Sequence, residues 1–222
     1  MSRKKKLVDL KPYERCAYCF RKGITDDHIP PKSIFGNVDK RGLPSVRSCK
    51  QCNVGSSVDD EYFKNVLAMR DGNKFTESEV LNKTLSCLRD NKKFCRNLSS
   101  KQVLGFTSSN LYVGPVMTYD IDFKIVHKVV NRITKGLFKF TFGNNVPWNY
   151  NVSTQMISDD YKSEGDHEIW SAFNKNIKTI RGMFSYSYLT CSDAKDVSAW
   201  FLNFYQRTSF YCLICNKNRE VY

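Results

Sequence analysis

Two pairs of cysteines near the start of the chain have the spacing of metal-binding knuckles. Cys16 and Cys19 form one Cys-x-x-Cys turn, and Cys49 and Cys52 form the other. Such a turn brings two thiolates close enough to share one zinc ion, and a second pair completes tetrahedral coordination. One pair alone could be two small core residues. Two pairs predict a structural Zn²⁺ site, because grouped cysteines in a reducing compartment bind metal before they form disulfides.

The segment between the two pairs, residues 20–48, holds a second set of polar side chains. It contains Asp26, Asp27 and His28, followed by two prolines, and Asn53 comes directly after the second pair. An acid next to a histidine is most often an ordinary surface ion pair. Here the knuckles and the prolines can hold both side chains rigidly, which makes Asp27 and His28 a candidate site.

Over about residues 14–70 the sequence resembles the HNH (His-Me finger) endonucleases, and within them the stand-alone bacterial and phage type. The family pattern is Cys-x-x-Cys, then Asp-His, then Cys-x-x-Cys followed by His or Asn. Three stretches carry the resemblance: Asp26–Phe35, Ser48–Gly55 and Asp59–Phe63. A further stretch, Arg132–Phe138, is only loosely similar to the later part of such proteins.

The resemblance implies a ββα-metal module in which His28 is the general base that deprotonates the attacking water. An imidazole suits this role because its unperturbed pKa of about 6.5 leaves much of it neutral near pH 7. Asp27 and Asn53 are then the expected ligands of a catalytic divalent cation, with Asp26 as the reserve carboxylate. Mg²⁺ is the expected cation because it prefers oxygen ligands and retains waters, and Mn²⁺ is its expected substitute.

One feature of the family has no counterpart in this sequence. The family usually carries a middle asparagine, in the strand before the second knuckle, that orients the histidine. The corresponding stretch, Arg41–Val46, contains no asparagine. A backbone carbonyl is the expected replacement that fixes the tautomer of the imidazole, and the alternative is a relative that binds nucleic acid without cutting it.

The resemblance implies an endonuclease that hydrolyses DNA phosphodiester bonds, with RNA as the alternative substrate. One site per chain predicts nicking, and cutting both strands would need a homodimer or two events. The resemblance also suggests a more specific role, as the cutting subunit of an antiviral (antiphage) defence system whose partner would be a separate ATPase. The competing class is a zinc-bearing nucleic-acid-binding or adaptor protein, which has no need of the trio Asp27, His28 and Asn53.

The charge of the chain also favours a nucleic-acid partner. Thirty-five Lys and Arg against 22 Asp and Glu give the 222 residues a formal net charge of +13. An excess of this size attracts phosphate backbones, and four zinc-bound thiolates would reduce it only to about +11. Four basic residues flank the candidate site and are expected to hold phosphates: Lys32, Arg41, Arg47 and Lys50.

Hydropathy gives no sign of a membrane partner. No apolar stretch approaches the roughly 20 residues that a membrane-spanning helix needs, and the basic start Met1–Lys6 is not followed by a signal-peptide core. The expected compartment is the cytoplasm, where thiols stay reduced. Apolar residues make up 41% of the chain, which is enough for a packed core.

The elements that position these residues are expected to form an α+β fold. The chain is expected to divide into a zinc-bound nuclease module at 1–75 and a helix-and-antiparallel-sheet region at 76–222 that contacts substrate or partners. Apolar spacing predicts helices at 59–69, 76–88 and 120–135, the last with Gly136 as its C-cap.

Short runs of aromatic and β-branched residues predict the strands of the antiparallel sheet. They lie at 138–142, 169–173, 180–189, 199–205 and 210–214. Residues 99–119 are expected to be a connector with one strand. Cys212 and Cys215 repeat the Cys-x-x-Cys spacing in an apolar run without a matching pair, which favours strand core over a second zinc site. Three other cysteines are expected to be small buried residues: Cys87, Cys95 and Cys191.

Overall fold

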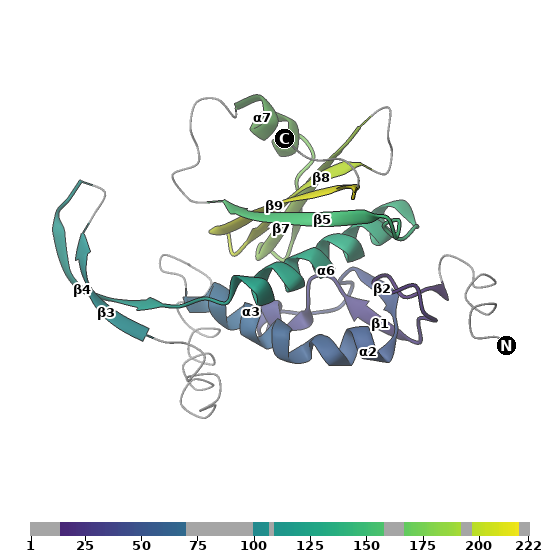
Figure 1. Cartoon of the computed structure of the whole chain (residues 1–222), viewed down its shortest axis with the longest axis horizontal. Coiled ribbons are helices and arrows are strands. Elements are labelled where there is room, and N and C mark those ends of the chain that lie inside the picture. The colour runs from purple at the N-terminus through teal and green to yellow at the C-terminus, as the bar shows by residue number, and fades with distance from the viewer. Residues whose placement is uncertain (1–13, 70–99, 107–108, 158–166, 192–196, 218–222) are drawn as a thin grey trace.

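The computed structural model describes residues 14–69, 100–106, 109–157, 167–191 and 197–217 (Figure 1). The chain has a mixed α+β fold, which confirms the predicted class. In the described ranges the strands form three antiparallel sheets, two of them two-stranded and one five-stranded. No helix of these ranges combines the length and the apolar character needed to cross a bilayer.

A β-hairpin followed by helices forms the N-terminal part of the described chain. In the hairpin, Thr25 stands opposite Ser48 and His28 stands opposite Ser45. The elements are, in order, β1 (Thr25–His28), the 3₁₀ turn η2 (Lys32–Phe35), β2 (Ser45–Ser48), α2 (Lys50–Asn53), the 3₁₀ turn η3 (Val54–Ser56) and α3 (Ser57–Met69). The predicted helix at 59–69 is therefore confirmed and begins two residues earlier.

Helix α3 forms where apolar residues recur at helical spacing and acids occupy the first turn. Tyr62, Phe63 and Leu67 are buried, and Asp60 lies in the first turn, where negative charge is favoured by the helix dipole. Phe63 lies edge-on to Phe204 of the large sheet, with ring centroids 5.1 Å apart. The buried stripe of α3 thus packs the N-terminal part against the sheet.

Helix α6 (Phe123–Phe142) crosses between the N-terminal hairpin and the large sheet (Figure 1). Asp122 caps its start by accepting a hydrogen bond from the Lys124 backbone N–H, and Gly143 ends it with a φ of 76°. The predicted helix at 120–135 is right in type but too short. Gly136 as a C-cap and a strand at 138–142 are wrong predictions, because the amphipathic pattern continues for about two more turns.

Gly136 lies inside α6 because the end of the hairpin lies against the helix backbone. A Cβ atom at this position would lie 2.8 Å from Ile29 Cδ1 and 3.2 Å from the Tyr18 hydroxyl oxygen. Ile29 directly follows His28 and is buried. The absence of a side chain at Gly136 therefore sets how closely α6 approaches the end of β1.

Replacing Gly136 by valine is expected to lower the free energy of unfolding by about 2 kcal/mol, because crowding in a packed core costs roughly 1–3 kcal/mol. The measurement is urea denaturation followed by circular dichroism. Gly55→Val is the control, because a Cβ at Gly55 meets no atom within 4 Å. The control should change the free energy by less than about 0.5 kcal/mol. Equal stability of the two variants would contradict the close packing of α6 on Ile29.

The large sheet is antiparallel, with the strand order β5-β9-β8-β7-β6. Its strands are β5 (Tyr150–Ile157), β6 (Lys178–Ile180), β7 (Phe184–Thr190), β8 (Ser198–Phe204) and β9 (Thr208–Asn216). The predicted strands at 199–205 and 210–214 are confirmed. The strand predicted at 180–189 is right only from Phe184 onward, because Ile180 ends β6 and a turn separates it from β7. The predicted strand at 169–173 is wrong, because these residues lie in helix α7 (His167–Asn174). Ile169, Trp170 and Phe173 have helical spacing, which outweighs the β propensity of the run.

One hydrophobic core joins α3, α6 and the large sheet. Trp200 of β8 is fully buried, and its indole N–H donates a hydrogen bond of 2.9 Å to the Ser198 hydroxyl. Phe142 of α6 lies edge-on to Trp200, with ring centroids 6.2 Å apart. The end of α6 is thereby anchored on the sheet while its middle lies against the hairpin.

The turn between β8 and β9 connects the large sheet to the segment that follows His28. Tyr205 and Gln206 have φ values of 54° and 59°, which is the conformation of a type I′ hairpin turn. Tyr205 is buried, and its hydroxyl donates a hydrogen bond of 2.6 Å to the Ile34 carbonyl in η2. The sheet therefore supports the 3₁₀ turn beside the candidate site.

Strands β3 (Ser100–Phe106) and β4 (Tyr112–Tyr119) form a separate hairpin that projects from the body (Figure 1). The connector predicted at 99–119 thus contains two paired strands rather than one. Several large apolar side chains of this segment are exposed: Val103, Leu104, Leu111, Tyr112 and Val113.

The cysteines outside the knuckles have different environments. Cys212 is buried in β9, as predicted, and Cys215 is half-buried. Cys191 is exposed, so its predicted burial is wrong; it directly follows β7, where the chain leaves the sheet. The predicted helix at 76–88, Cys87 and Cys95 lie outside the described residues. The domain division at residue 75 stays a prediction.

Candidate functional site

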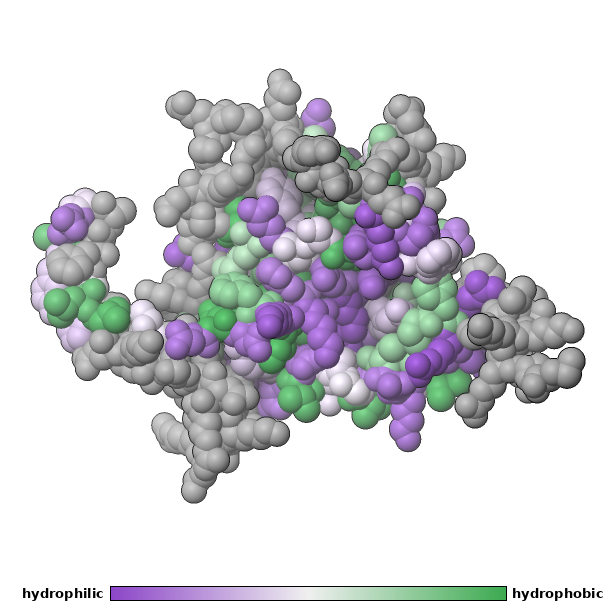
Figure 2. All heavy atoms as spheres, viewed as in Figure 1, coloured by the Kyte–Doolittle hydropathy of each residue, from purple (hydrophilic) through white to green (hydrophobic). Residues whose placement is uncertain are grey.

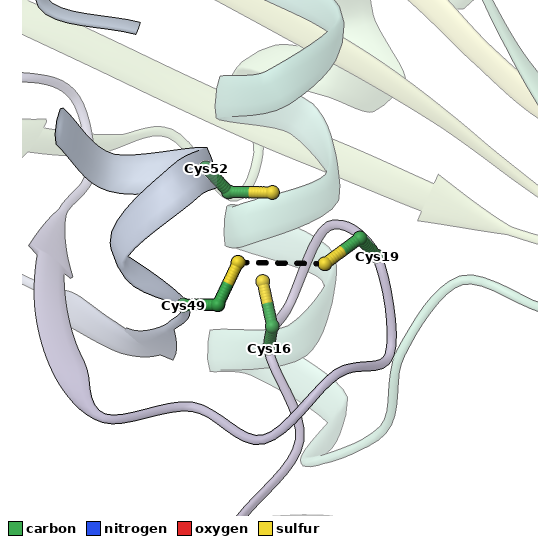
Figure 3. A group of neighbouring side chains, drawn as sticks. All are labelled: Cys16, Cys19, Cys49 and Cys52. Carbon is green, nitrogen blue, oxygen red and sulfur yellow. Dashed lines mark hydrogen bonds between the residues drawn. The ribbon is translucent and has the colours of Figure 1, made fainter. Parts of the chain in front are cut away.

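The four cysteines of the two predicted knuckles meet in one cluster (Figure 3). Their Sγ atoms all lie within 4.8 Å of one another, and those of Cys19 and Cys49 are 3.6 Å apart. A disulfide needs about 2.05 Å, so these two thiols are not bonded to each other. Zinc bound by thiolates at about 2.3 Å holds its sulfur atoms about 3.8 Å apart. The cluster could therefore hold a metal ion such as zinc.

Backbone hydrogen bonds shape each knuckle. In the first, the Phe20 N–H donates to the Cys16 carbonyl at 3.3 Å, and Phe20 takes a φ of 64°. In the second, the N–H groups of Cys52 and Asn53 donate to the Cys49 carbonyl at 3.1 and 3.0 Å. These bonds begin α2 at the cluster, so the position of Asn53 depends directly on the second knuckle.

The surroundings of the cluster favour a bound cation. Burial raises the pKa of the Cys16 thiol, but hydrogen bonds from the backbone of Cys49, Tyr18 and Cys19 bring it down to about 7. Burial and the neighbouring thiols raise the pKa of Cys52. Thiols this close oppose one another's ionisation, and a divalent cation removes that repulsion.

The hairpin β1–β2 and helix α2 place the predicted trio. Asp27 is buried, 7% exposed, and His28 follows it half-buried at the end of β1. Asn53 reaches β1 from α2, where its Nδ2 donates to Thr25 Oγ1 at 3.1 Å and to the Asp26 carbonyl at 3.3 Å. Because the amide nitrogen binds β1, the amide oxygen is left to act as an acceptor.

A cleft of about 560 Å³ brings Asp27, His28 and Asn53 together. Carboxylates outnumber basic side chains in its lining. The acids are Asp26, Asp27, Asp60 and Glu61, and the lysines are Lys32 and Lys64. An acidic cleft with an amide oxygen suits a hard divalent cation better than it suits a bare phosphate.

Asp27 also belongs to a buried group of charges. Its Oδ2 accepts a hydrogen bond of 2.8 Å from the Tyr18 hydroxyl and lies 3.5 Å from Arg132 Nη1. Arg132 of α6 also donates to the Ser56 hydroxyl and forms an ion pair with Asp60. Two carboxylates, Asp27 and Asp60, thus share one guanidinium beside the cleft.

Tyr18, Asp60 and Arg132 were missed as site residues by the sequence analysis. Two of them could have been found from the stretches that resemble the HNH family. Asp60 lies in a matched stretch, and Arg132 begins the loosely matched one. Burial raises the pKa of Asp60, although the Arg132 guanidinium opposes the shift. Burial and the Asp27 carboxylate raise the pKa of Tyr18, so its hydroxyl remains a donor to Asp27.

The electrostatic surroundings of His28 favour a neutral imidazole. Burial lowers its pKa, and the Lys32 ammonium lowers it further, while Asp27 and Asp26 oppose the shift. A neutral imidazole at pH 7 can accept a proton. Ser45 is the cross-strand partner of His28 in β2, at the strand where the family carries its middle asparagine.

The four predicted phosphate ligands lie in different places. Lys32 lines the cleft. Arg41 forms an ion pair of 2.9 Å with Asp39, and Arg47 pairs with Asp26 at 3.0 Å. Lys50 is exposed at the start of α2 and does not line the cleft.

Helix α6 adds basic side chains that were not predicted. Figure 2 shows hydrophilic residues gathered over the middle of the molecule, where Figure 1 places α6. Lys124 and Lys128 are exposed on this helix, and Lys128 pairs with Asp59 at 2.7 Å. The face of α6 that is not buried is therefore positively charged over its first half.

Comparison with protein-family models, with curated proteins and with solved structures found no match for the chain.

Proposed function

We propose that the chain is a metal-dependent endonuclease of the HNH (His-Me finger) type that hydrolyses DNA phosphodiester bonds. The observation that carries the proposal is the cleft in which Asp27, His28 and Asn53 come together beside a cluster of four thiols. A hairpin followed by helices holds these residues, in keeping with the ββα module that the resemblance implies. The formal charge of +13 supports a polyanionic substrate.

In this mechanism His28 is the general base. Its imidazole takes a proton from a water molecule as that water attacks the phosphorus atom. The lowered pKa keeps the base neutral and ready at pH 7. His28 is half-buried and lines the cleft, where the substrate phosphate would lie.

Asp27 and Asn53 would hold the catalytic cation, with Mg²⁺ the best fit to two oxygen ligands. Tyr18 and Arg132 engage Asp27 Oδ2, which leaves Oδ1 for the cation. When bound, such a cation would supply positive charge to stabilise the phosphate and the departing oxygen. The lean protein ligand set leaves positions for water and for the substrate.

Zinc in the thiol cluster would have a structural role. The cluster joins the loop before β1 to the start of α2, and His28 ends β1 while Asn53 ends α2. Thiolate coordination of this kind contributes directly to folding. It would hold the general base and the cation ligands at a constant separation.

A binding protein without catalysis is the second candidate. The Arg132 guanidinium already compensates Asp27, the carboxylate that the cation needs. The strand β2 also lacks the asparagine that orients the histidine in the family. In this alternative the same cleft and the basic side chains bind nucleic acid without hydrolysis.

The test is to incubate zinc-loaded protein with supercoiled plasmid in the presence of Mg²⁺, Mn²⁺ or no added cation. We expect nicked circles before linear product, only with added cation, because each chain carries one site. Parallel reactions with single-stranded DNA and RNA define the substrate. If the protein binds DNA in a mobility-shift assay but cleaves it with none of the cations, the proposal of a nuclease is wrong and that of a binding protein takes its place.

A further inference from the structure

A second cavity, of about 210 Å³, shares Tyr18 with the candidate site. Tyr18 lines this cavity, and its hydroxyl donates to Asp27 of the cleft. The other walls come from the first knuckle, from α6, from the segment after α6, from the start of β5 and from the residue that follows β9. They include Phe20, Lys135, Pro147, Trp148, Asn151 and Lys217. A ligand in this cavity would lie one side chain away from the proposed cation ligand.

Trp148 is the unusual member of this lining. It is 79% exposed, more than any other large apolar side chain of the described residues. The turn that carries it is well held, because Tyr150 N–H donates to the Pro147 carbonyl at 3.0 Å and Lys217 N–H donates to the Asn149 carbonyl at 2.9 Å. A large aromatic ring in water on a fixed turn is typical of a binding surface.

The charge of the cavity indicates what it binds. Lys135 and Lys217 line it, and no Asp or Glu does so among the described residues. The two lysines line the same cavity; burial and the Lys217 ammonium lower the pKa of Lys135, while the Cys52 thiol opposes the shift. An aromatic face beside two ammonium groups suits a planar ring that carries a phosphate.

We propose that this cavity binds an unpaired nucleotide of the strand that enters the cleft. The base stacks on Trp148, and Lys135 and Lys217 hold the adjoining phosphates. The inference rests on the proposed function for the identity of the strand, but binding itself requires no hydrolysis. A protein partner is disfavoured, because the paired lysines on a chain of charge +13 select a polyanion.

The test measures binding in the full-length His28→Ala protein, so that cleavage cannot interfere. Fluorescein-labelled oligo(dT), oligo(rU) and a DNA hairpin duplex are titrated at constant salt and followed by fluorescence anisotropy. Trp148→Ala is expected to weaken binding of the single strands at least about fivefold, because one stacked base is lost. Duplex binding should change less than about twofold. Trp148→Phe, which keeps a ring, should recover most of the affinity.

Phe140→Ala is the matched control, because Phe140 is an exposed aromatic residue of α6, 50% exposed, that does not line the cavity. It should bind all three probes like the parent protein. Unchanged single-strand binding by Trp148→Ala, an equal loss for the duplex, or no rescue by Trp148→Phe would each overturn the proposal. If single-strand binding depends on Trp148 but the parent protein with His28 intact cuts no DNA, the nucleotide site stands and the proposed nuclease activity falls. The failure of one proposal is therefore distinguishable from the failure of the other.

Discussion

Replacing His28 by alanine is expected to reduce metal-dependent plasmid cleavage by about 100-fold or more, the contribution typical of a general base. The reason is that His28 is the only imidazole among the described residues that line the cleft. Its lowered pKa supports a neutral, proton-accepting ring. The measurement is the initial rate of nicking at saturating DNA, with Mg²⁺ and with Mn²⁺.

His127→Ala is the matched control for the loss of an imidazole. His127 lies on α6, contacts the Phe123 ring and does not line the cleft. Its variant should keep the nicking rate within about threefold and the parent's zinc content. If the His28→Ala protein nicks DNA at the rate of the parent protein, His28 is not the general base, even if cleavage still requires the cation. The zinc content of His28→Ala must equal that of the parent, because His28 contributes no thiol to the cluster.

Replacing Cys49 by serine is expected to abolish stoichiometric zinc binding and to lower the free energy of unfolding by about 3 kcal/mol or more. Structural zinc contributes roughly 10–16 kcal/mol of apparent binding free energy in small zinc-finger peptides, and one lost thiolate forfeits part of it. For a chain of this size, 3 kcal/mol corresponds to a Tm lower by about 6–12 °C. The measurements are elemental analysis of purified protein and thermal unfolding by circular dichroism.

Cys191→Ser is the control for this variant, because Cys191 is exposed and outside the cluster. It should keep both the zinc content and the Tm of the parent. Cleavage should fail in Cys49→Ser, because without zinc the second knuckle, whose backbone turn holds Asn53, is no longer tied to the first. A Cys49→Ser protein with full zinc content and an unchanged Tm would show that the four thiols do not bind metal.

Features with short-range patterns were predictable from the sequence. The two knuckles form because Cys-x-x-Cys spacing closes within one turn, and α3 forms because its apolar stripe and acidic first turn act over a few residues. The secondary-structure predictions were wrong where two local sequence patterns compete. Residues 138–142 and 169–173 are rich in aromatic residues, which favours strands, but both continue a helical spacing. Strand β5 was not predicted, although its burial alternates along most of its length.

By itself, the sequence determined the local chemistry: which thiols can share a metal, and which acid, histidine and asparagine lie beside them. Only the tertiary structure decided what surrounds Asp27. Arg132 reaches it from 105 positions later in the chain, and Asp60 joins them through the same guanidinium. No periodic pattern encodes such a contact, because it depends on how closely α6 packs against the hairpin. That distance is set by Gly136, whose missing side chain admits Ile29 and Tyr18.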